Sequence, residues 1–275
     1  MSTEADRGAG VDSGAAALRP MRVNWIGFWT LFRKEVARFL AVPGQTVASP
    51  VITTSLYFLV FGYSLGSRLK QMGGMPYIQY IVPGLVMLSV ISSSFLNTSS
   101  SLFGAKVMGT IVDILVTPLA PAEIVAAMLL GAVVRATLVG FLVWMVAAVF
   151  VGPLLAHPLY ILAFVVLVSV MMGAFGLIVA TWSDKFEQLS IVPTFVLTPL
   201  TYLGGVFYTL DALPDFWRRA SLFNPVVYMV NGLRYGMLGI TDVPIQRATL
   251  LAALAACVFT LAAWGVIRSG WKLRG

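Results

Sequence analysis

The side chains that most often carry out catalysis are scarce in this sequence. His157 is the only histidine and Cys257 the only cysteine. A Ser-His-Asp or Cys-His site would have to use His157, which precedes Pro158 in a short loop. Cys257 lies in an apolar run, and one cysteine can form neither an intrachain disulfide nor a cysteine metal cluster. We therefore expect no catalytic site here and interpret His157 as an ordinary loop residue.

No pair of acidic residues lies together in an apolar run, and Glu123 lies only at the margin of one. Asp113, Asp184 and Glu187 all lie in loops between such runs, whereas proton-coupled transporters carry acids within their membrane spans. The chain also lacks a G-x-x-x-x-G-K-[ST] sequence, the usual loop that binds the phosphates of ATP. Neither a proton relay nor ATP hydrolysis is expected of this chain.

Two arginines stand out because they interrupt apolar segments. Arg135 lies within 122–151 and Arg234 within 222–240. An arginine near the middle of a span costs on the order of 2.5–3.5 kcal/mol by insertion scales, so it should face protein or water. Arg135 either lines or gates a path, or bonds to backbone carbonyls or a partner helix. For Arg234 we favour the structural role.

The composition of the whole chain points to a membrane. Of its 275 residues, 59% are apolar and 11% are charged, whereas soluble domains carry roughly 25% charged residues. The net charge of +7 could suggest nucleic acid as a partner, but the basic residues lie mainly at the ends of apolar runs. That placement is typical of orientation in a bilayer, so we expect no nucleic-acid binding. The predicted fold class is an all-α integral membrane protein.

Six segments are long and apolar enough to span a membrane, which needs about 20 residues. They are 46–66, 78–101, 122–151, 158–182, 189–208 and 248–267. These six predicted spans define a transmembrane domain over 46–275. Residues 1–20 have no signal-peptide pattern and are expected to be a disordered tail.

Residues 21–45 form the segment that precedes the first span, and 24–41 within it are predicted to be an amphipathic helix. Its apolar side chains fall within an arc of about 120°, with Lys34, Glu35 and Arg38 outside it. The arc contains Trp25, Phe28, Trp29, Phe32, Val36, Phe39 and Leu40. Such a helix lies at the membrane interface or packs on a partner domain, and both can be true of one helix.

Lysine and arginine set the orientation of membrane proteins. With six spans both termini share a side, and that side holds eleven basic residues against six on the other. The eleven are Arg7, Arg19, Arg22, Arg33, Lys34, Arg38, Lys106, Lys185, Arg268, Lys272 and Arg274. The six are Arg68, Lys70, Arg218, Arg219, Arg234 and Arg247. We therefore predict that both termini are cytoplasmic.

The segment 222–240 is apolar but contains Pro225, Gly232 and Gly236, which we expect to break it. We predict a re-entrant or interfacial helical hairpin on the outer face, before the last span. Broken backbone at membrane depth must be covered by protein or line a water-filled cavity. The candidate intramembrane or gating residues are therefore Arg135, Asn224, Pro225, Arg234 and Tyr235.

The loop 102–121 is too apolar for a solvated loop and too polar for a span. Ile111, Ile114 and Leu115 form one apolar face, and Pro118 and Pro121 end the element. An apolar face exposed to the cytosol would need a partner, so we predict that this short helix docks on another protein. The alternative is an interfacial helix lying on lipid.

The stretch from Gly109 to Leu119, G-T-I-x-D-I-L-x-T-P-L, resembles the cytoplasmic signature of bacterial ABC-2 type permeases, G-T-L-E-x-L-L-x-T-P-L. Residues 190–209, then A-L-P-D-F-W (212–217), N-P-V-V-Y-M-V-N-G-L-R-Y-G-M-L-G (224–239) and D-V-P (242–244), follow in the family's order and spacing. The resemblance covers nearly all of the chain after its N-terminal tail. Val112 departs from the family's acidic residue, and Asp113 follows it.

This resemblance implies a permease that pairs with a second copy and binds two copies of a cytosolic ATPase subunit. ATP and Mg²⁺ would be bound by that ATPase, and this chain would need no cofactor. Relatives include exporters of nodulation factors, anthracyclines and cell-surface polysaccharides. The chain would lie in the bacterial cytoplasmic (inner) membrane and contact its lipids.

The resemblance also implies which residues couple ATP hydrolysis to transport. In the loop they would be Lys106, Gly109, Thr110, Asp113, Leu115 and Pro118. Residues 183–188, with Asp184, Lys185 and Glu187, would form a second and smaller contact. The amphipathic helix would be the family's connecting helix beside the ATPase.

The expected function is export of an amphipathic, lipid-like, glycan or drug substrate, by alternating access or a lateral gate between two permease copies. Spans one, two and five would supply most of the path. Two alternatives are a channel or transporter that needs no ATPase, and a membrane enzyme acting on lipid-linked substrates. An enzyme would have to use Asp211, Asp215, Arg218 and Arg219, which form no convergent set in the sequence.

Overall fold

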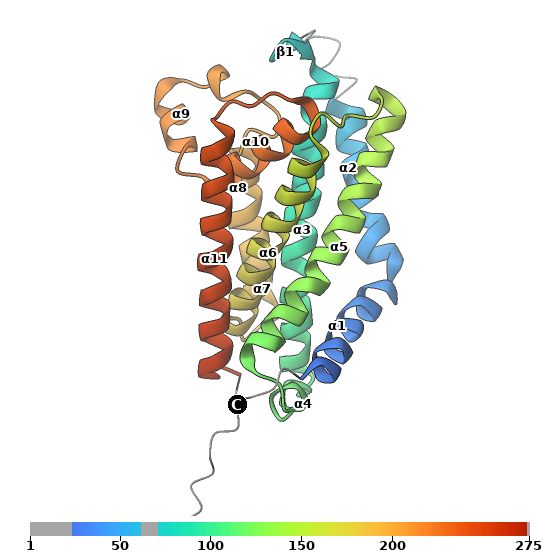
Figure 1. The fold of residues 1–275 in the computed structure, drawn as a ribbon, viewed down its shortest axis with the longest axis vertical. Helices are drawn as coiled ribbons and strands as arrows, with labels where there is room; N and C mark the ends of the chain where they lie inside the picture. Colours follow the sequence, from blue (N-terminus) through green and yellow to red (C-terminus); the bar gives the residue numbers. More distant parts are fainter. Residues whose placement is uncertain (1–23, 62–70, 274–275) are drawn as a thin grey trace, which may run out of the picture.

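The computed structural model describes residues 24–61 and 71–273, and these form a bundle of upright helices (Figure 1). Within that part of the chain, four helices are long and apolar enough to cross a membrane. They are α3 (Tyr77–Val107), α5 (Pro121–Val151), α6 (Pro158–Trp182) and α11 (Ile245–Ser269). They coincide with the second, third, fourth and sixth predicted spans, with α3 running six residues further. The predicted tail, residues 1–20, lies outside the described residues.

The first and fifth predicted spans are built from shorter helices joined by π-helical turns. The first consists of η1 (Gly44–Ala48) and α2 (Ser49–Leu59), and its predicted end lies outside the described residues. The fifth consists of α7 (Phe186–Val192), η3 (Pro193–Leu197) and α8 (Thr198–Tyr202). Proline has no N–H to donate to the preceding turn, which accounts for the irregular turn that starts at Pro193.

Helix α3 lies at the centre of the bundle, between α5 and α6. Where α3 meets α6 the backbones approach closely, because a Cβ atom on Gly176 would lie 2.6 Å from the carbonyl oxygen of Phe95. Thr98 Oγ1 donates a hydrogen bond to the Gly173 carbonyl, at 2.7 Å, across the same contact. Small residues and interhelical hydrogen bonds hold helices together where lipid removes the hydrophobic drive.

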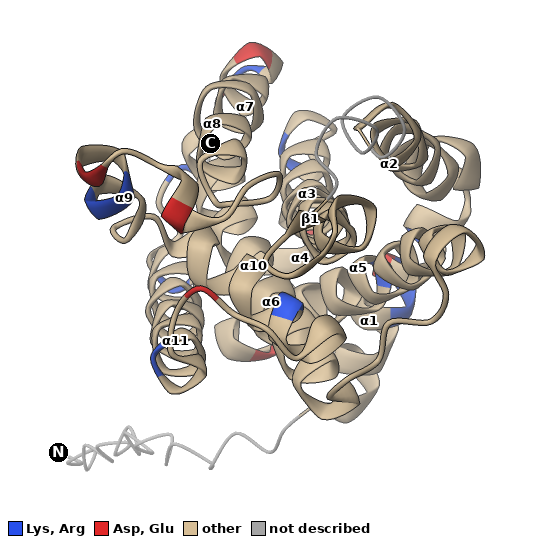
Figure 2. Ribbon diagram, turned by 90° about the horizontal axis from the view of Figure 1, so that it is seen from above, with Lys and Arg blue, Asp and Glu red and all other residues tan. Residues whose placement is uncertain are grey.

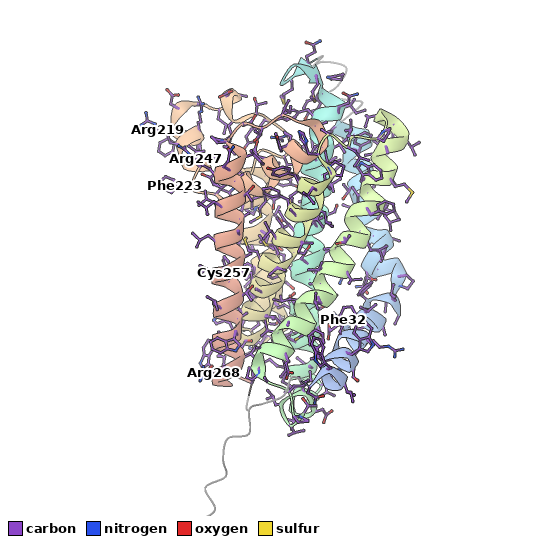
Figure 3. The ribbon with its side chains drawn as sticks, viewed as in Figure 1. Phe32, Arg219, Phe223, Arg247, Cys257 and Arg268 are labelled. Carbon is purple, nitrogen blue, oxygen red and sulfur yellow. The ribbon has the colours of Figure 1, made fainter. Side chains whose placement is uncertain are left out.

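Helix α11 packs on α6 and α10 at the edge of the bundle. It buries a stripe of four alanines, Ala248, Ala252, Ala256 and Ala263, together with Ile267 near its end. Figure 3 shows Arg247 and Arg268 near its two ends, with Cys257 between them. The two arginines are separated by roughly 32 Å at 1.5 Å per residue, close to the thickness of a bilayer's hydrocarbon core.

The amphipathic helix forms as predicted, as α1 (Trp25–Leu40), but it is oriented differently from the prediction. Its buried residues are Leu31, Glu35 and Phe39, and it packs on α5. Trp25 and Trp29, placed in the apolar arc, are exposed. The prediction placed Glu35 on the polar side of the helix, whereas its carboxylate accepts hydrogen bonds inside the bundle. The exposed tryptophans remain available to a membrane interface.

The end of the bundle near α9 consists of short elements. They are β1 (Gln71–Met72), β2 (Met75–Pro76), η4 (Leu210–Ala212), α9 (Asp215–Ser221) and α10 (Pro225–Leu238). The expectation that Gly232 and Gly236 break the 222–240 segment was wrong, because α10 runs through both. They instead permit contact with α6: a Cβ on Gly232 would lie 2.0 Å from the Phe164 ring.

The opposite end carries both described termini. There α4 (Ile111–Leu115) lies below α3, α1 begins, and the chain ends after α11 (Figure 1). The loop 102–121 and the second expected contact, 183–188, therefore lie at one end of the bundle, together with the start of α1.

Changing Gly232 to alanine should destabilise the fold by about 1–3 kcal/mol, because the added methyl group overlaps the Phe164 ring. Thermal unfolding of the purified protein in detergent measures this. Gly265→Ala is the matched control: it lies in α11 with open space around the new methyl group, so it should leave stability unchanged or raise it slightly. Equal effects of the two changes would contradict the close packing of α10 on α6.

Candidate functional site

Lys106 joins the loop 102–121 to the end of α6. From the last turn of α3 its ammonium group donates to the carbonyl oxygens of Thr181 at 2.8 Å, Ser183 at 2.7 Å and Ala180 at 3.3 Å. The last carbonyls of a helix have no partner within it and carry partial negative charge. Lys106 thus caps α6 and holds α3 and α6 in register at this end.

Asp184 brings a second lysine to the same place. Its carboxylate is 4.0 Å from Lys106 Nζ and 2.5 Å from Lys272 Nζ. Lys272 also donates to the Trp182 carbonyl at 3.1 Å. Three segments that are distant in sequence, the ends of α3 and α6 and the residues after α11, therefore meet around one carboxylate.

The hydrogen bond from Lys272 lowers the pKa of Asp184, and the charges of Lys272 and Lys106 add to this effect while partial desolvation opposes it. A carboxyl group with a lowered pKa stabilises the fold above its ordinary pKa, and that stabilisation is lost as the pH falls through the lowered value. At neutral pH the contact is fully formed. Because Asp184 is at the surface, its contribution is screened by solvent.

Helix α4 presents a different face from the one predicted. Ile111 and Ile114 are buried against the bundle and Leu115 is half-buried. The predicted exposed apolar face is therefore wrong, because these side chains complete the core beneath α3. The apolar residues that are exposed around α4 are Val107, Met108, Val112 and Val116.

Gly109 and Thr110 form the turn that separates α3 from α4. Gly109 has φ of +74°, a left-handed conformation that glycine adopts readily and other residues rarely do. This turn reverses the chain and presents Val112 and Asp113 outward, where both are exposed. Val112, the departure from the family pattern, thus stands on the exposed side of α4.

Glu123 ties the start of α1 to the end of the same loop. Its carboxylate accepts hydrogen bonds from the backbone N–H of Asn24, at 2.7 Å, and of Ala120, at 2.6 Å. The Asn24 side chain donates to the Pro118 carbonyl at 3.3 Å. Sequence reasoning missed this contact, although an acidic residue in the first turn of a helix that starts at Pro121 is a capping signal.

A cavity of about 630 Å³ lies between α4 and the residues after α11. It is lined by Lys106, Gly109, Ile111, Val112, Leu115, Val116, Lys272 and Leu273. Three of the six coupling residues expected in this loop, Lys106, Gly109 and Leu115, thus line one cavity. We refer to α4, its exposed apolar residues and this cavity as the coupling surface.

The segment 183–188, the second expected contact, is held by hydrogen bonds to one of its own side chains. The Gln188 side chain accepts from the backbone N–H of Asp184 at 2.7 Å and of Lys185 at 3.4 Å. Lys185 and Glu187 are exposed. Asp184, through Lys106, and Phe186, whose ring centre is 6.4 Å from that of Phe103, join this segment to the loop 102–121.

At the other end of the bundle Arg234 lies in a buried polar network. Its guanidinium group is fully buried, lies 3.3 Å from Asp242 Oδ2 and donates to the Gly205 carbonyl at 2.6 Å. It also lies 4.1 Å from the centre of the Tyr80 ring. Asp242 in addition accepts the backbone N–H of Leu210 at 3.3 Å. Arg234 therefore fastens α10, α3, the turn before η4 and the loop after α10.

The sequence analysis missed Asp242 as the partner of Arg234. The signal was present, because a buried arginine needs a counter-charge and Asp242 is the first acidic residue after it. Gly239, with φ of +74°, ends α10 and turns the chain back. Three residues later the carboxylate faces the helix it has just left.

The remaining candidates at this end of the bundle, Asn224, Pro225 and Tyr235, lie on α10 or next to its first residue. Asn224 caps its start, accepting from the Val226 N–H at 2.9 Å and donating to the Leu200 carbonyl at 2.6 Å. Pro225 occupies the first helical position. Tyr235 stacks on His157, with ring centres 4.7 Å apart. His157 is thus a packing residue between the α5–α6 loop and α10.

Arg135 is buried within α5, and its guanidinium donates to the Thr46 carbonyl in η1 at 3.3 Å. The structure thus gives it a backbone carbonyl as partner.

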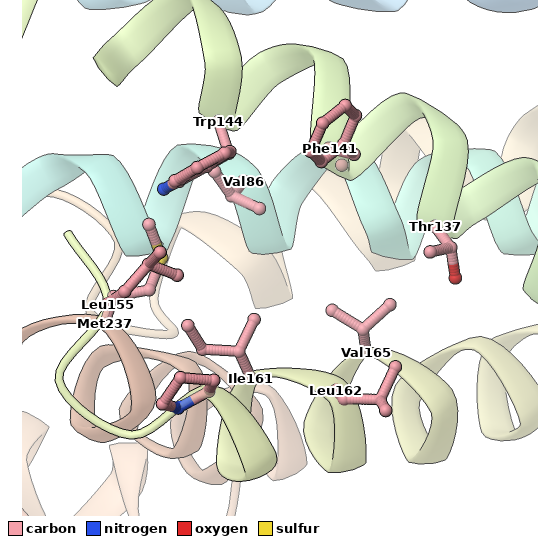
Figure 4. Close-up of a pocket in the computed structure, with 11 residues that line it drawn as sticks. Val86, Thr137, Phe141, Trp144, Leu155, Ile161, Leu162, Val165 and Met237 are labelled. Atoms are coloured by element: carbon pink, nitrogen blue, oxygen red, sulfur yellow. The ribbon is translucent and has the colours of Figure 1, made fainter. Parts of the chain in front are cut away.

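A second cavity, of about 310 Å³, lies between α5 and α6 near the outer elements (Figure 4). Figure 4 shows Phe141 and Trp144 on one side, facing Ile161, Leu162 and Val165. The side chains that line this cavity are almost all apolar, so it has few polar groups that could bind a polar ligand or take part in catalysis.

The chain resembles known membrane transport proteins along most of its length. A family model described as ABC-2 type transporter matches residues 26–238. The chain is 43% identical over 255 residues to the inner membrane transport permease YadH of Escherichia coli, covering 92% of this chain and 99% of that protein. It is 27% identical over 250 residues to nodulation protein J of Sinorhizobium fredii, covering 90% and 92%. With nodulation protein J of Rhizobium leguminosarum the identity is 25% over 230 residues, covering 82% and 86%.

Replacing Asp242 with alanine should destabilise the protein by roughly 3–5 kcal/mol, because it leaves the buried Arg234 without its counter-charge. The double change Asp242→Leu with Arg234→Met should cost less. Arg218→Gln is the control, since it breaks the exposed pair with Asp211 (2.9 Å) and should cost under about 1 kcal/mol. Denaturation in detergent compares them, and an Asp242→Ala protein as stable as Arg218→Gln would contradict the assigned network.

Proposed function

This chain belongs to the ABC-2 type transporter family, and from that premise we propose that it is the membrane-spanning subunit of an exporter driven by a separate ATPase. Families of this kind normally pair a permease with an ATPase subunit. The observation that carries the proposal is the coupling surface, an exposed apolar element at the same end of the bundle as both described termini.

The two sides of α4 suit it to transmit force. Its inner side, with Ile111 and Ile114, is packed in the core, while Val112 and Val116 remain exposed. An exposed apolar patch on a monomer marks a binding surface. An ATPase bound to Val112 and Val116 would therefore move α4 together with the helices on which it rests.

Two rigid contacts would pass this movement on. Lys106 joins the end of α3 to the end of α6, and Glu123 joins the loop to the start of α1. Motion of the coupling surface would therefore reach α3, α6 and α1 directly. Alternating access or opening of a lateral gate would follow from changes in how these helices pack.

Two copies of the chain would complete the transport path. The side of the bundle formed by α2, α3 and η3 exposes large apolar residues, among them Leu56, Leu96 and Phe195. We propose that this side meets a second copy, as a homodimer, with two ATPase subunits below. A heterodimer with a related permease would use the same side.

The chain is proposed to lie in the cytoplasmic membrane of a bacterium with six spans and both termini in the cytoplasm. The relatives named above include an inner membrane permease, and basic residues are more numerous at the end that carries α4. The two composite helices, η1–α2 and α7–η3–α8, would be the first and fifth spans. The cargo would be an amphipathic molecule, such as a lipid-like compound, a glycan carrier or a drug.

Val112→Lys should abolish binding of the ATPase without unfolding the permease, because the exposed side chain contributes no core contact. We expect at least a tenfold loss of copurification and of permease-dependent ATP hydrolysis with a co-expressed ATPase chosen from the neighbouring genes. Val112→Thr, similar in shape and uncharged, should retain both. Full coupling in Val112→Lys would count against the proposed docking surface.

The orientation can be tested with single cysteines. Cys257 is the only native cysteine, so Cys257→Ser gives a cysteine-free background. In that background Val112→Cys should react with a membrane-impermeant maleimide only after cells are opened, whereas Phe223→Cys, exposed beside α9, should react in intact cells. The reverse pattern would place the coupling surface outside the cell and exclude an ATP-driven role for it.

A further inference from the structure

A polar cluster lies between α1, α3 and α5, away from the coupling surface. Glu35 accepts a hydrogen bond from Ser101 at 2.6 Å and is 3.2 Å from Arg38 Nη2. The same Arg38 nitrogen donates to the backbone and side-chain oxygens of Asn97, at 2.7 and 3.2 Å. In Figure 2 blue and red ribbon lie side by side where α1 passes α5.

Arg135 belongs to the same cluster. It stands one turn beyond Gly131, where a Cβ atom would lie 2.8 Å from Glu35 and 3.6 Å from the Asn97 amide nitrogen. It is 5% exposed, and its one bonded partner within the described residues is the Thr46 carbonyl. The cluster therefore holds two guanidinium groups and one carboxylate, an excess of one positive charge.

Three hydrogen-bond donors of this cluster have no acceptor in the described structure. They are Nε of Arg38, Nδ2 of Asn97 and Nε of Arg135, and all three atoms are buried. Asn97 itself is fully buried and Arg135 is nineteen-twentieths buried. Buried donors are almost always paired, and buried charges are paired as well. An anion beside these three side chains would pair the donors and balance the excess positive charge.

The cluster can be reached from outside the bundle. The side chain of Arg38 is 31% exposed, and it also donates to Ser100, which is exposed on α3, at 3.2 Å. Arg38 is therefore the partly exposed member of the cluster, whereas Asn97 and Arg135 are buried. Guanidinium groups bind phosphate and carboxylate oxygens in pairs, with a geometry that ammonium groups lack.

The depth of the cluster indicates what kind of molecule brings the anion. If α5 enters the bilayer at its first residue, Arg135 lies about 21 Å along the helix from that point, at 1.5 Å per residue, which is below the lipid head groups. A lipid resting in the leaflet keeps its head group at the surface. An amphiphile in passage between leaflets must carry its head group through this depth.

We propose that Arg38, Asn97 and Arg135 bind the anionic head group, a phosphate or carboxylate, of the amphiphile that this chain transports. The inference rests on the proposed exporter function and narrows its cargo to acidic amphiphiles. Glu35 positions Arg38 and leaves the charge of Arg135 for the cargo.

Binding can be tested on the purified permease alone, in an uncharged detergent, by thermal unfolding with three probes. Dihexanoyl phosphatidic acid should raise the unfolding temperature by several degrees, whereas dihexanoyl glycerol, which lacks the phosphate, should not. Inorganic phosphate should act at least tenfold more weakly than the acid. An equal response to the glycerol compound, or to inorganic phosphate, would overturn the assignment to an acidic amphiphile.

The variants Arg135→Gln and Arg38→Gln should each abolish the response to phosphatidic acid. Arg33→Gln, which removes an exposed arginine from the same helix α1, is the matched control and should keep it. If Arg135→Gln fails to fold, the double change Arg38→Gln with Glu35→Gln decides, because it removes the guanidinium group without leaving the buried Glu35 carboxylate unpaired. A response that survives in Arg38→Gln would overturn the proposal.

A second measurement separates this site from the exporter function. In the complex with the ATPase, phosphatidic acid should stimulate ATP hydrolysis in the wild type and in Arg33→Gln but not in Arg38→Gln. Binding without any ATPase coupling in the wild type would refute the exporter function and the transport role of the site. ATP hydrolysis that depends on the permease but does not change on addition of phosphatidic acid would refute the anion site alone.

Discussion

The carbonyl groups that end a helix need donors, and inside or beside a bilayer water cannot be relied on to supply them. At the end of α6 that donor is the ammonium group of Lys106, which reaches three carbonyl oxygens from a different helix. Asp184 and Lys272 then gather around the same point. The position of α4, and with it the whole coupling surface, depends on this one capped helix end.

The same constraint shapes the opposite end of the molecule. Arg234 has no access to water and binds Asp242, the Gly205 carbonyl and the Tyr80 ring instead. At both ends of the bundle, protein groups rather than water satisfy the buried polar groups, but the two arrangements differ. The network around Arg234 fixes the packing of α10, whereas the coupling surface leaves apolar side chains exposed.

The sequence allowed the long helices to be predicted closely, because about 20 apolar residues with no charge have few alternatives to a membrane helix. It did not reveal which side of α4 or α1 faces inward. Ile111 and Ile114 were expected outside and are buried, and Glu35 was expected at the surface and is buried as well. In each case the buried side of the helix is set by contacts with residues far away in the chain, such as the hydrogen bond from Ser101 to Glu35. The periodicity of apolar residues along one helix carries no information about such contacts. Arg234 was expected to have a structural role, but its partner Asp242 was not predicted. The contact between them depends on a turn at Gly239 that reverses the chain.

The alanine stripe of α11 has a consequence for how the sequence can change. Where the stripe of α11 meets its neighbours the contact is made by methyl groups, which allows the backbones to approach closely, while Phe259 and Trp264 pack beside it. Lipid chains adapt to any apolar shape, so outside the stripe many substitutions among leucine, valine and phenylalanine leave the free energy almost unchanged. Selection on α11 therefore acts on a few small residues, and relatives can diverge widely along the rest of this helix while retaining the same packing.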